Sequence, residues 1–113
     1  MSFGLDIVID AHTEDEEWVE VVDGHTYNLA PMWKKALPRL LASGSTSDLN
    51  GKPCEDVLPH LLEGLQDAVL NEPDYRALEP SNGWGDYEGF LLIYRRFTRL
   101  CHENPRGVIV WNG

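Results

Sequence analysis

The stretch PCEDVLPHLLEGLQDAV, residues 53–69, has an apolar stripe that the rest of the fold must cover. Its apolar residues recur at spacings of three and four, which is typical of a helix with one buried face. The stripe consists of Cys54, Val57, Leu58, Leu61, Leu62, Leu65 and Val69. Pro59 interrupts it, because proline lacks a backbone N–H and crowds the preceding turn. We therefore predict a short turn before Pro59 and the main helix after it.

Downstream of this segment, the sequence predicts one helical turn over 72–78, a long helix and a strand. Asp86 is a suitable N-cap for the long helix, which we place over 86–103. The apolar face of this helix consists of Phe90, Ile93, Tyr94, Phe97, Leu100 and Cys101. The helix-stopping run at 104–107 contains proline and glycine, and the apolar run at 108–111 predicts a final strand.

Upstream, the sequence predicts three strands. Residues 5–11 are rich in β-branched side chains and predict a strand that is buried on at least one face. Residues 18–22 and 25–28 flank Asp23 and Gly24. This dipeptide supplies the positive φ angles of a two-residue type I′ turn, so the segment predicts a hairpin.

Between the hairpin and the central stripe, residues 31–43 predict a helix with proline in its first turn and a kink at Pro38. The resulting element order is β-β-β-α-α-α-β. We therefore expect an α+β fold in which helices pack on one face of a small antiparallel or mixed sheet. The length of 113 residues fits a single domain over 1–113.

The charge is strongly negative and unevenly placed. The chain has 19 acidic and 9 basic side chains, for a formal net charge of −10. This balance argues against direct nucleic-acid binding, because phosphate contacts need a surplus of Lys and Arg. Residues 1–33 contain no Lys or Arg, and their acidic residues are Asp6, Asp10, Glu14, Asp15, Glu16, Glu17, Glu20 and Asp23. The sequence therefore predicts an acidic face.

Several functional classes lack any sequence support. Cys54 and Cys101 fall on apolar helix faces and predict reduced thiols in a cytoplasmic protein. The first six residues lack the features of a signal peptide, and no apolar run is long enough to predict a membrane span. No histidine has the spacing of a metal ligand, and the run 14–17 lacks the pattern of a calcium loop. We expect no metal, no cofactor and no catalytic residue.

Two stretches are unusual, TYNLAPMW at 26–33 and NGWGDYEG at 82–89. In the structural interpretation, Asn28 and Asp86 cap helices, and the aromatic residues belong to the core. In the functional interpretation, the two stretches meet and form a pocket with aromatic walls and free N–H groups at helix starts. In either case, we expect Trp84 and Tyr87 to pack against the corner formed by Asn28, Met32 and Trp33.

These two stretches, together with YRAL at 75–78, resemble a family of small proteins that bacteriophages and bacteria encode, actinobacteria among them. The resemblance rests on the motif pair T-x-N-x-x-x-M-W and N-G-W-G-x-Y-x-G and spans most of the chain. It implies an origin and a fold, with a phage accessory gene as the expected context. It implies no reaction.

We derive two hypotheses for function. The first is an inhibitor or regulator, in the extreme case a DNA mimic, that binds a basic surface of a host protein through an acidic face. Its predicted contact residues are Glu14, Asp15, Glu16, Glu17, Glu20 and Asp23. The alternative is a module that binds a small polar, nucleotide-like ligand at the junction of the two stretches. Its predicted residues are Asn28, Met32, Trp33, Asn82, Trp84, Tyr87, Arg95, Arg96 and Arg99.

Overall fold

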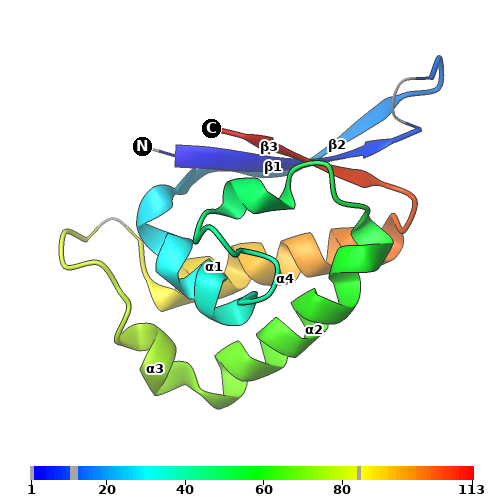
Figure 1. The fold of residues 1–113 in the computed structure, drawn as a ribbon. Helices are drawn as coiled ribbons and strands as arrows, with labels where there is room; N and C mark the ends of the chain where they lie inside the picture. Colours follow the sequence, from blue (N-terminus) through cyan, green and yellow to red (C-terminus); the bar gives the residue numbers. More distant parts are fainter. Residues whose placement is uncertain (1, 11–12, 84) are drawn as a thin grey trace.

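A three-stranded antiparallel sheet lies on one side of the molecule, and the helices cover one of its faces (Figure 1). The computed structural model describes residues 2–10, 13–83 and 85–113, with only the backbone described at Ser2 and at residues 20–27. Strand β1 (Ser2–Ile9) is central, with β2 (Glu17–Thr26) and β3 (Val108–Asn112) on either side of it. The α+β class is confirmed, and the sheet is antiparallel throughout its described pairs.

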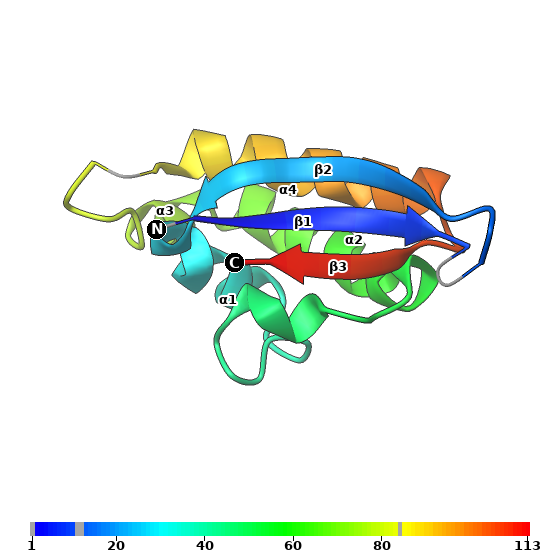
Figure 2. The same cartoon turned by 90° about the horizontal axis from the view of Figure 1, so that it is seen from above.

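The alternating side chains of β1 explain why only one face of the sheet is covered. Phe3, Leu5 and Ile7 point to the same side and are buried against the helices. On the opposite side, Asp6 and Val8 face away from the helices, and the view onto the sheet in Figure 2 shows all three strands uncovered on this side. The fold therefore leaves one sheet face open.

The predicted hairpin at Asp23-Gly24 is wrong. Strand β2 runs through both residues without turning, so the sheet has three strands rather than four. Phe3 pairs with His25 and Leu5 with Val22, which gives β2 an extra residue at this point. The dipeptide thus lies in a β-bulge, where glycine is also favoured. Pairing of β2 along the whole length of β1 therefore outweighs the local preference of the dipeptide for a turn.

Helix α1 (Ala30–Ala36) follows a short 3₁₀ turn (Tyr27–Leu29) and is shorter than predicted. Pro38 ends this helix instead of kinking it. A residue that precedes proline avoids the α-helical region, and Leu37 has φ −125° and ψ 58°. The proposed cap at Asn28 is also wrong, because Leu29 occupies the N-cap position and makes no side-chain cap hydrogen bond.

Helix α2 (Cys54–Leu70) continues through Pro59, so the predicted break is also wrong. Pro59 lies on the exposed side of α2, where water can bond the carbonyl that its missing N–H leaves unpaired. The buried residues on both sides of it, Val57 and Leu61, hold one continuous face against the core. Burial of this stripe outweighs the local cost of the proline.

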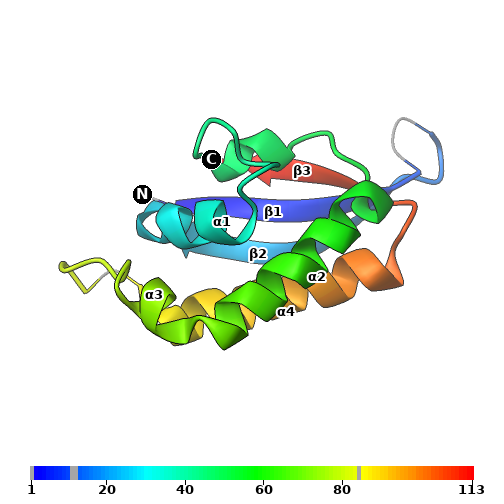
Figure 3. The same cartoon turned by 60° about the horizontal axis from the view of Figure 1, so that its bottom comes forward.

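Helices α3 (Glu72–Arg76) and α4 (Tyr87–Glu103) match the predicted segments, and Asp86 caps α4 by accepting a hydrogen bond from the Gly89 N–H. Figure 3 shows α4 beside α2. Two buried tyrosines of α4 set the antiparallel register. Tyr87 Oη donates to the Ala68 carbonyl at 2.7 Å, and Tyr94 Oη donates to the Leu61 carbonyl at 2.8 Å.

The centre of the core is Trp33 of α1, which is fully buried. Its ring lies 5.6 Å from the ring of Phe90, 5.2 Å from that of Tyr94 and 6.2 Å from that of Phe97. Its ring also makes an edge contact with Phe3 at 6.4 Å. Trp33 therefore joins the sheet to α4, and this position explains why the helix layer stays on one face.

Candidate functional site

The β1–β2 connection is built so that its acidic side chains point outward. Thr13 organises it, because its hydroxyl donates to the Asp10 carbonyl at 2.6 Å and accepts from the Asp15 N–H at 3.3 Å. Asp10 has a φ of 53°, a left-handed conformation that Asp tolerates better than most residues. The four acidic side chains at 14–17 are exposed. We call residues 14–17 the acidic loop.

Trp18 lies next to the acidic loop on the open sheet face. It is 56% exposed, and its Nε1 donates to Glu16 Oε1 at 2.8 Å. Trp18 pairs with Val8 of β1, which pairs on its other side with Val108 of β3. These three side chains form one row across the sheet. Val8 is only 2% exposed although it faces away from the helices, so its neighbours cover it.

A hollow of about 230 Å³ lies beside this row. Its lining is mostly apolar and consists of Val8, Glu16, Trp18, Asn50, Gly51, Val108, Ile109 and Val110. We call the surface formed by Trp18, Val8, Val108, Val110 and the acidic loop the Trp18 face. The Trp18 face therefore combines a half-exposed indole, an apolar hollow and an acidic rim.

The structure brings four of the six predicted partner-binding residues together in the acidic loop. Glu20 pairs with Asp6, and Asp23 lies at the bulge of β2, where the side chains are outside the described part of the chain. Sequence reasoning missed Trp18 as a contact residue. The signal that could have found it is the alternation of side chains along β2. The partly buried Val19 packs against the core, so its neighbour Trp18 lies on the opposite face of the sheet.

Among the described residues predicted to bind a ligand, none lines the hollow beside Trp18, and three belong to the core. Met32 and Trp33 are fully buried, and Tyr87 is nearly so. Tyr87 reaches the Trp33 cluster through Tyr75 and Phe90, with ring distances of 6.4 Å and 5.9 Å along that path. These three predicted residues are core residues. Their burial leaves no surface there for a ligand to contact.

The remaining predicted ligand residues are spread over the surface. Asn28 is half-buried in the 3₁₀ turn, and Asn82 is exposed in the loop before α4. Arg95, Arg96 and Arg99 are exposed along α4. Trp84 lies outside the described residues, so its predicted packing against Met32 remains a prediction.

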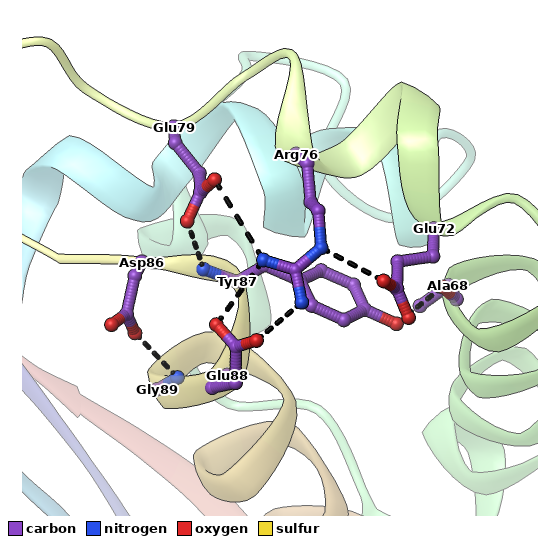
Figure 4. A network of polar contacts seen from close by, with 8 residues as sticks. All are labelled: Ala68, Glu72, Arg76, Glu79, Asp86, Tyr87, Glu88 and Gly89. Atoms are coloured by element: carbon purple, nitrogen blue, oxygen red, sulfur yellow. Dashed lines mark hydrogen bonds and ion pairs between the residues drawn. The ribbon is translucent and has the colours of Figure 1, made fainter.

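An ion-pair cluster around Arg76 fastens the loop between α3 and α4 (Figure 4). Arg76 Nε lies 2.8 Å from Glu72 Oε2, and the guanidinium also pairs with Glu88 and contacts the Tyr87 ring at 4.8 Å. The hydrogen bond from Arg76 lowers the pKa of Glu88 and raises that of Arg76 itself. Glu79 accepts from the Tyr87 N–H at 2.9 Å. These contacts therefore hold the connection between α3 and α4 in place, which is a structural role.

A larger hollow of about 460 Å³ lies between α1 and α2, and sequence reasoning missed it. Its lining contains charges of both signs and consists of Lys35, Ala36, Leu37, Pro38, Arg39, His60, Glu63, Gly64, Gln66, Asp67, Leu70 and Asn71. On one wall, Asp67 accepts from Tyr75 Oη at 2.6 Å. Burial and this hydrogen bond raise the pKa of Tyr75 above its usual value.

Among the described residues, no group of three His, Cys, Asp or Glu side chains could hold a metal ion. Cys54 and Cys101 are buried free thiols, and a hydrogen bond between them, together with burial, raises the pKa of Cys101. None of the described helices is long and apolar enough to cross a membrane. No protein-family model and no solved structure matches this chain.

Proposed function

We propose that this chain is a non-catalytic accessory protein that binds a basic surface of a host protein through its Trp18 face. The observation that carries the proposal is the exposure of Trp18, 56%, beside an apolar hollow and the acidic loop. The resemblance to phage and bacterial proteins favours an inhibitor or regulator. The two reduced thiols favour action in the cytosol.

The Trp18 side chain has the properties of a binding hot spot. Tryptophan is enriched among the few residues that dominate interface energies, and such residues are ringed by contacts that exclude water. The hydrogen bond to Glu16 restricts the indole before a partner arrives. Less conformational entropy is then lost on binding, which strengthens the complex.

The acidic loop defines the chemistry of the partner. Four adjacent carboxylates at the rim would accelerate encounter with a basic surface and repel acidic competitors. The apolar row behind them requires an apolar or aromatic partner side chain that fits a hollow of about 230 Å³. This combination favours a host protein that is recognised through apolar and charged contacts together over one recognised by simple DNA mimicry, since a mimic needs only the charges.

The proposal is tested with the immobilised chain and host lysate at low and high salt. We expect one specific host protein to be captured at low salt and released at high salt. Trp18→Ala, and separately Ser at all four acidic-loop positions, should abolish its capture. The matched control replaces the exposed acidic residues Glu55, Asp56, Glu63 and Glu103 with Ser and should retain capture. Equal capture by all the variants would contradict the proposal.

A small polar ligand is a second candidate, and the hollow between α1 and α2 favours it. Its volume of about 460 Å³ lies in the range of small-molecule sites, which is about 300–1,000 Å³. Arg39 and His60 are available there as partners for an anion. A panel of nucleotides should raise the melting temperature of the wild-type chain and leave that of Arg39→Ala/His60→Ala unchanged. No nucleotide-dependent shift would dismiss this candidate.

A further inference from the structure

The outer surface of α2 and α4 is the second unusual surface of the molecule. Among the described side chains, the large apolar ones that are most exposed are Trp18, Leu62, Val69, Leu70 and Leu92. All of these except Trp18 belong to α2 or α4. Figure 3 shows α2 and α4 toward the viewer, with α3 against the end of the pair where α4 begins. We call this surface the α2–α4 face.

The two helices carry opposite charge. Helix α2 contains no Lys or Arg, and its acidic residues are Glu55, Asp56, Glu63 and Asp67. Glu63 and Asp67 line the hollow between α1 and α2, so the acidic residues of the α2–α4 face are the exposed Glu55 and Asp56. Helix α4 exposes Arg95, Arg96 and Arg99. Its acidic residues are already paired, Glu88 with Arg76 and Glu103 with Arg99 at 3.9 Å. The α2–α4 face therefore has one acidic half and one basic half, side by side.

The antiparallel register makes this pattern self-complementary. The tyrosine bonds align residue 87 with 68 and residue 94 with 61, so residue 99 is level with about residue 56. Leu92 is likewise almost level with Leu62. A two-fold axis parallel to the helices would lay α2 of one copy on α4 of the other. Arg99 would then face Glu55 of the second copy, and the two exposed leucines would meet.

We infer that the α2–α4 face is a homodimer interface whose partner is a second copy of this chain. Each helix has 17 residues and is about 25 Å long at 1.5 Å per residue. Two adjacent helices about 20 Å wide would bury about 500 Å² per copy. That area lies near the lower end of specific interfaces, so the dimer should dissociate in the micromolar range.

The test is a charge exchange that needs no knowledge of any other partner. One variant carries Arg95→Glu and Arg99→Glu, which leaves Arg96 as the basic residue among the three arginines. The other carries Glu55→Arg and Asp56→Arg, which places basic side chains on both helices. All four side chains are exposed, so both variants should fold, and their circular dichroism spectra verify this. The matched control carries Glu14→Arg and Glu17→Arg, the same charge change on the Trp18 face.

Sedimentation equilibrium over about 5–500 µM covers the range expected for an interface of this area. At moderate salt, the wild-type mass should rise with concentration from 12.8 kDa toward twice that value. Each exchanged variant alone should stay monomeric, and their equimolar mixture should form the dimer again. The control should dimerise like the wild type. A monomeric wild type, dimers of either variant alone or a monomeric mixture would overturn the inference, whatever else binds this face.

Discussion

Gly64 marks the closest approach between α1 and α2. A Cβ atom at this position would lie 2.5 Å from the Ala36 carbonyl oxygen and 2.3 Å from Tyr94 Oη. Real Cβ atoms do not approach backbone or hydroxyl oxygens so closely. Glycine is needed here because it lets α1 and α2 approach closely. A larger side chain would push α1 away from α2 and disturb the Tyr94 hydrogen bond.

We predict that Gly64→Ala destabilises the protein although alanine favours helices. The gain in helix propensity is about 1 kcal/mol, whereas overpacking costs about 1–3 kcal/mol. Because the clash involves the Ala36 backbone, we expect the upper part of that range, about 2–3 kcal/mol, and a net loss of about 1–2 kcal/mol. Urea denaturation measures it. Gln66→Ala on the exposed side of α2 is the control and should change stability by less than about 0.5 kcal/mol. An unchanged midpoint for Gly64→Ala would contradict the observed packing.

The buried tyrosines make a second prediction at this scale. Burial raises the pKa values of Tyr75, Tyr87 and Tyr94 above 10, their usual value. Above pH 10 the unfolded chain loses phenolic protons that the folded chain keeps, so the free energy of unfolding should fall as the pH rises. Phenolate absorbance should show at least three of the four tyrosines resisting ionisation until the protein unfolds. Joint titration of all four near pH 10 in the folded state would refute this.

At the scale of elements, the sequence predicted helix positions better than helix ends and turns. The apolar stripe of α4 and the Asp86 cap were sufficient to predict this helix, because both signals are local and point to the same structure. Pro38, Pro59 and the Asp23-Gly24 dipeptide misled the prediction. Pro38 ended α1 for a local reason, the restricted conformation of Leu37, which the prediction of a kink did not weigh. At Pro59 and at the dipeptide the outcome depends on contacts with a distant segment, such as β1 for the dipeptide, and such contacts leave no local trace.

The Arg76 cluster gives a prediction about one segment rather than about overall stability. Arg76→Ala removes the ion pairs that join α3 to the start of α4, so the connection between them should open more often. Amide hydrogen exchange should become faster over residues 77–83 and stay unchanged in α2. Arg96→Ala, an exposed change on α4, is the control. Faster exchange throughout the chain would mean that Arg76 supports the whole fold instead.

At the scale of the whole molecule, composition predicted the acidic loop but not the Trp18 face. The charge of residues 1–33 can be counted, and the structure places four of those carboxylates in one exposed loop. The apolar half of the surface needs Val108 and Val110, which come from the other end of the chain. The hollow between α1 and α2 likewise depends on the spacing of two helices. Neither arrangement can be read from local patterns.

The charge of the whole molecule leads to a prediction about stability. Replacing residues 14–17 with Ser removes four negative charges from a net charge of −10. These side chains are exposed and crowded, so relief of repulsion should leave the melting temperature unchanged or raise it. Thermal denaturation at low salt measures the effect, which should shrink as salt is added. A large drop in melting temperature would show that the loop stabilises the fold.

The position of β1 in the sheet also determines the order in which the protein can be completed as it is synthesised. Its first neighbour, β2, follows within a few residues, whereas β3 pairs with it across almost the whole length of the chain. Until residues 108–112 have emerged, one edge of the central strand has no partner, and the side chain of Ile109 is missing from the core. The growing chain must therefore carry an open strand edge while residues 10–107 are synthesised, a stage at which unpaired edges are prone to aggregation. The emergence of β3 closes this edge.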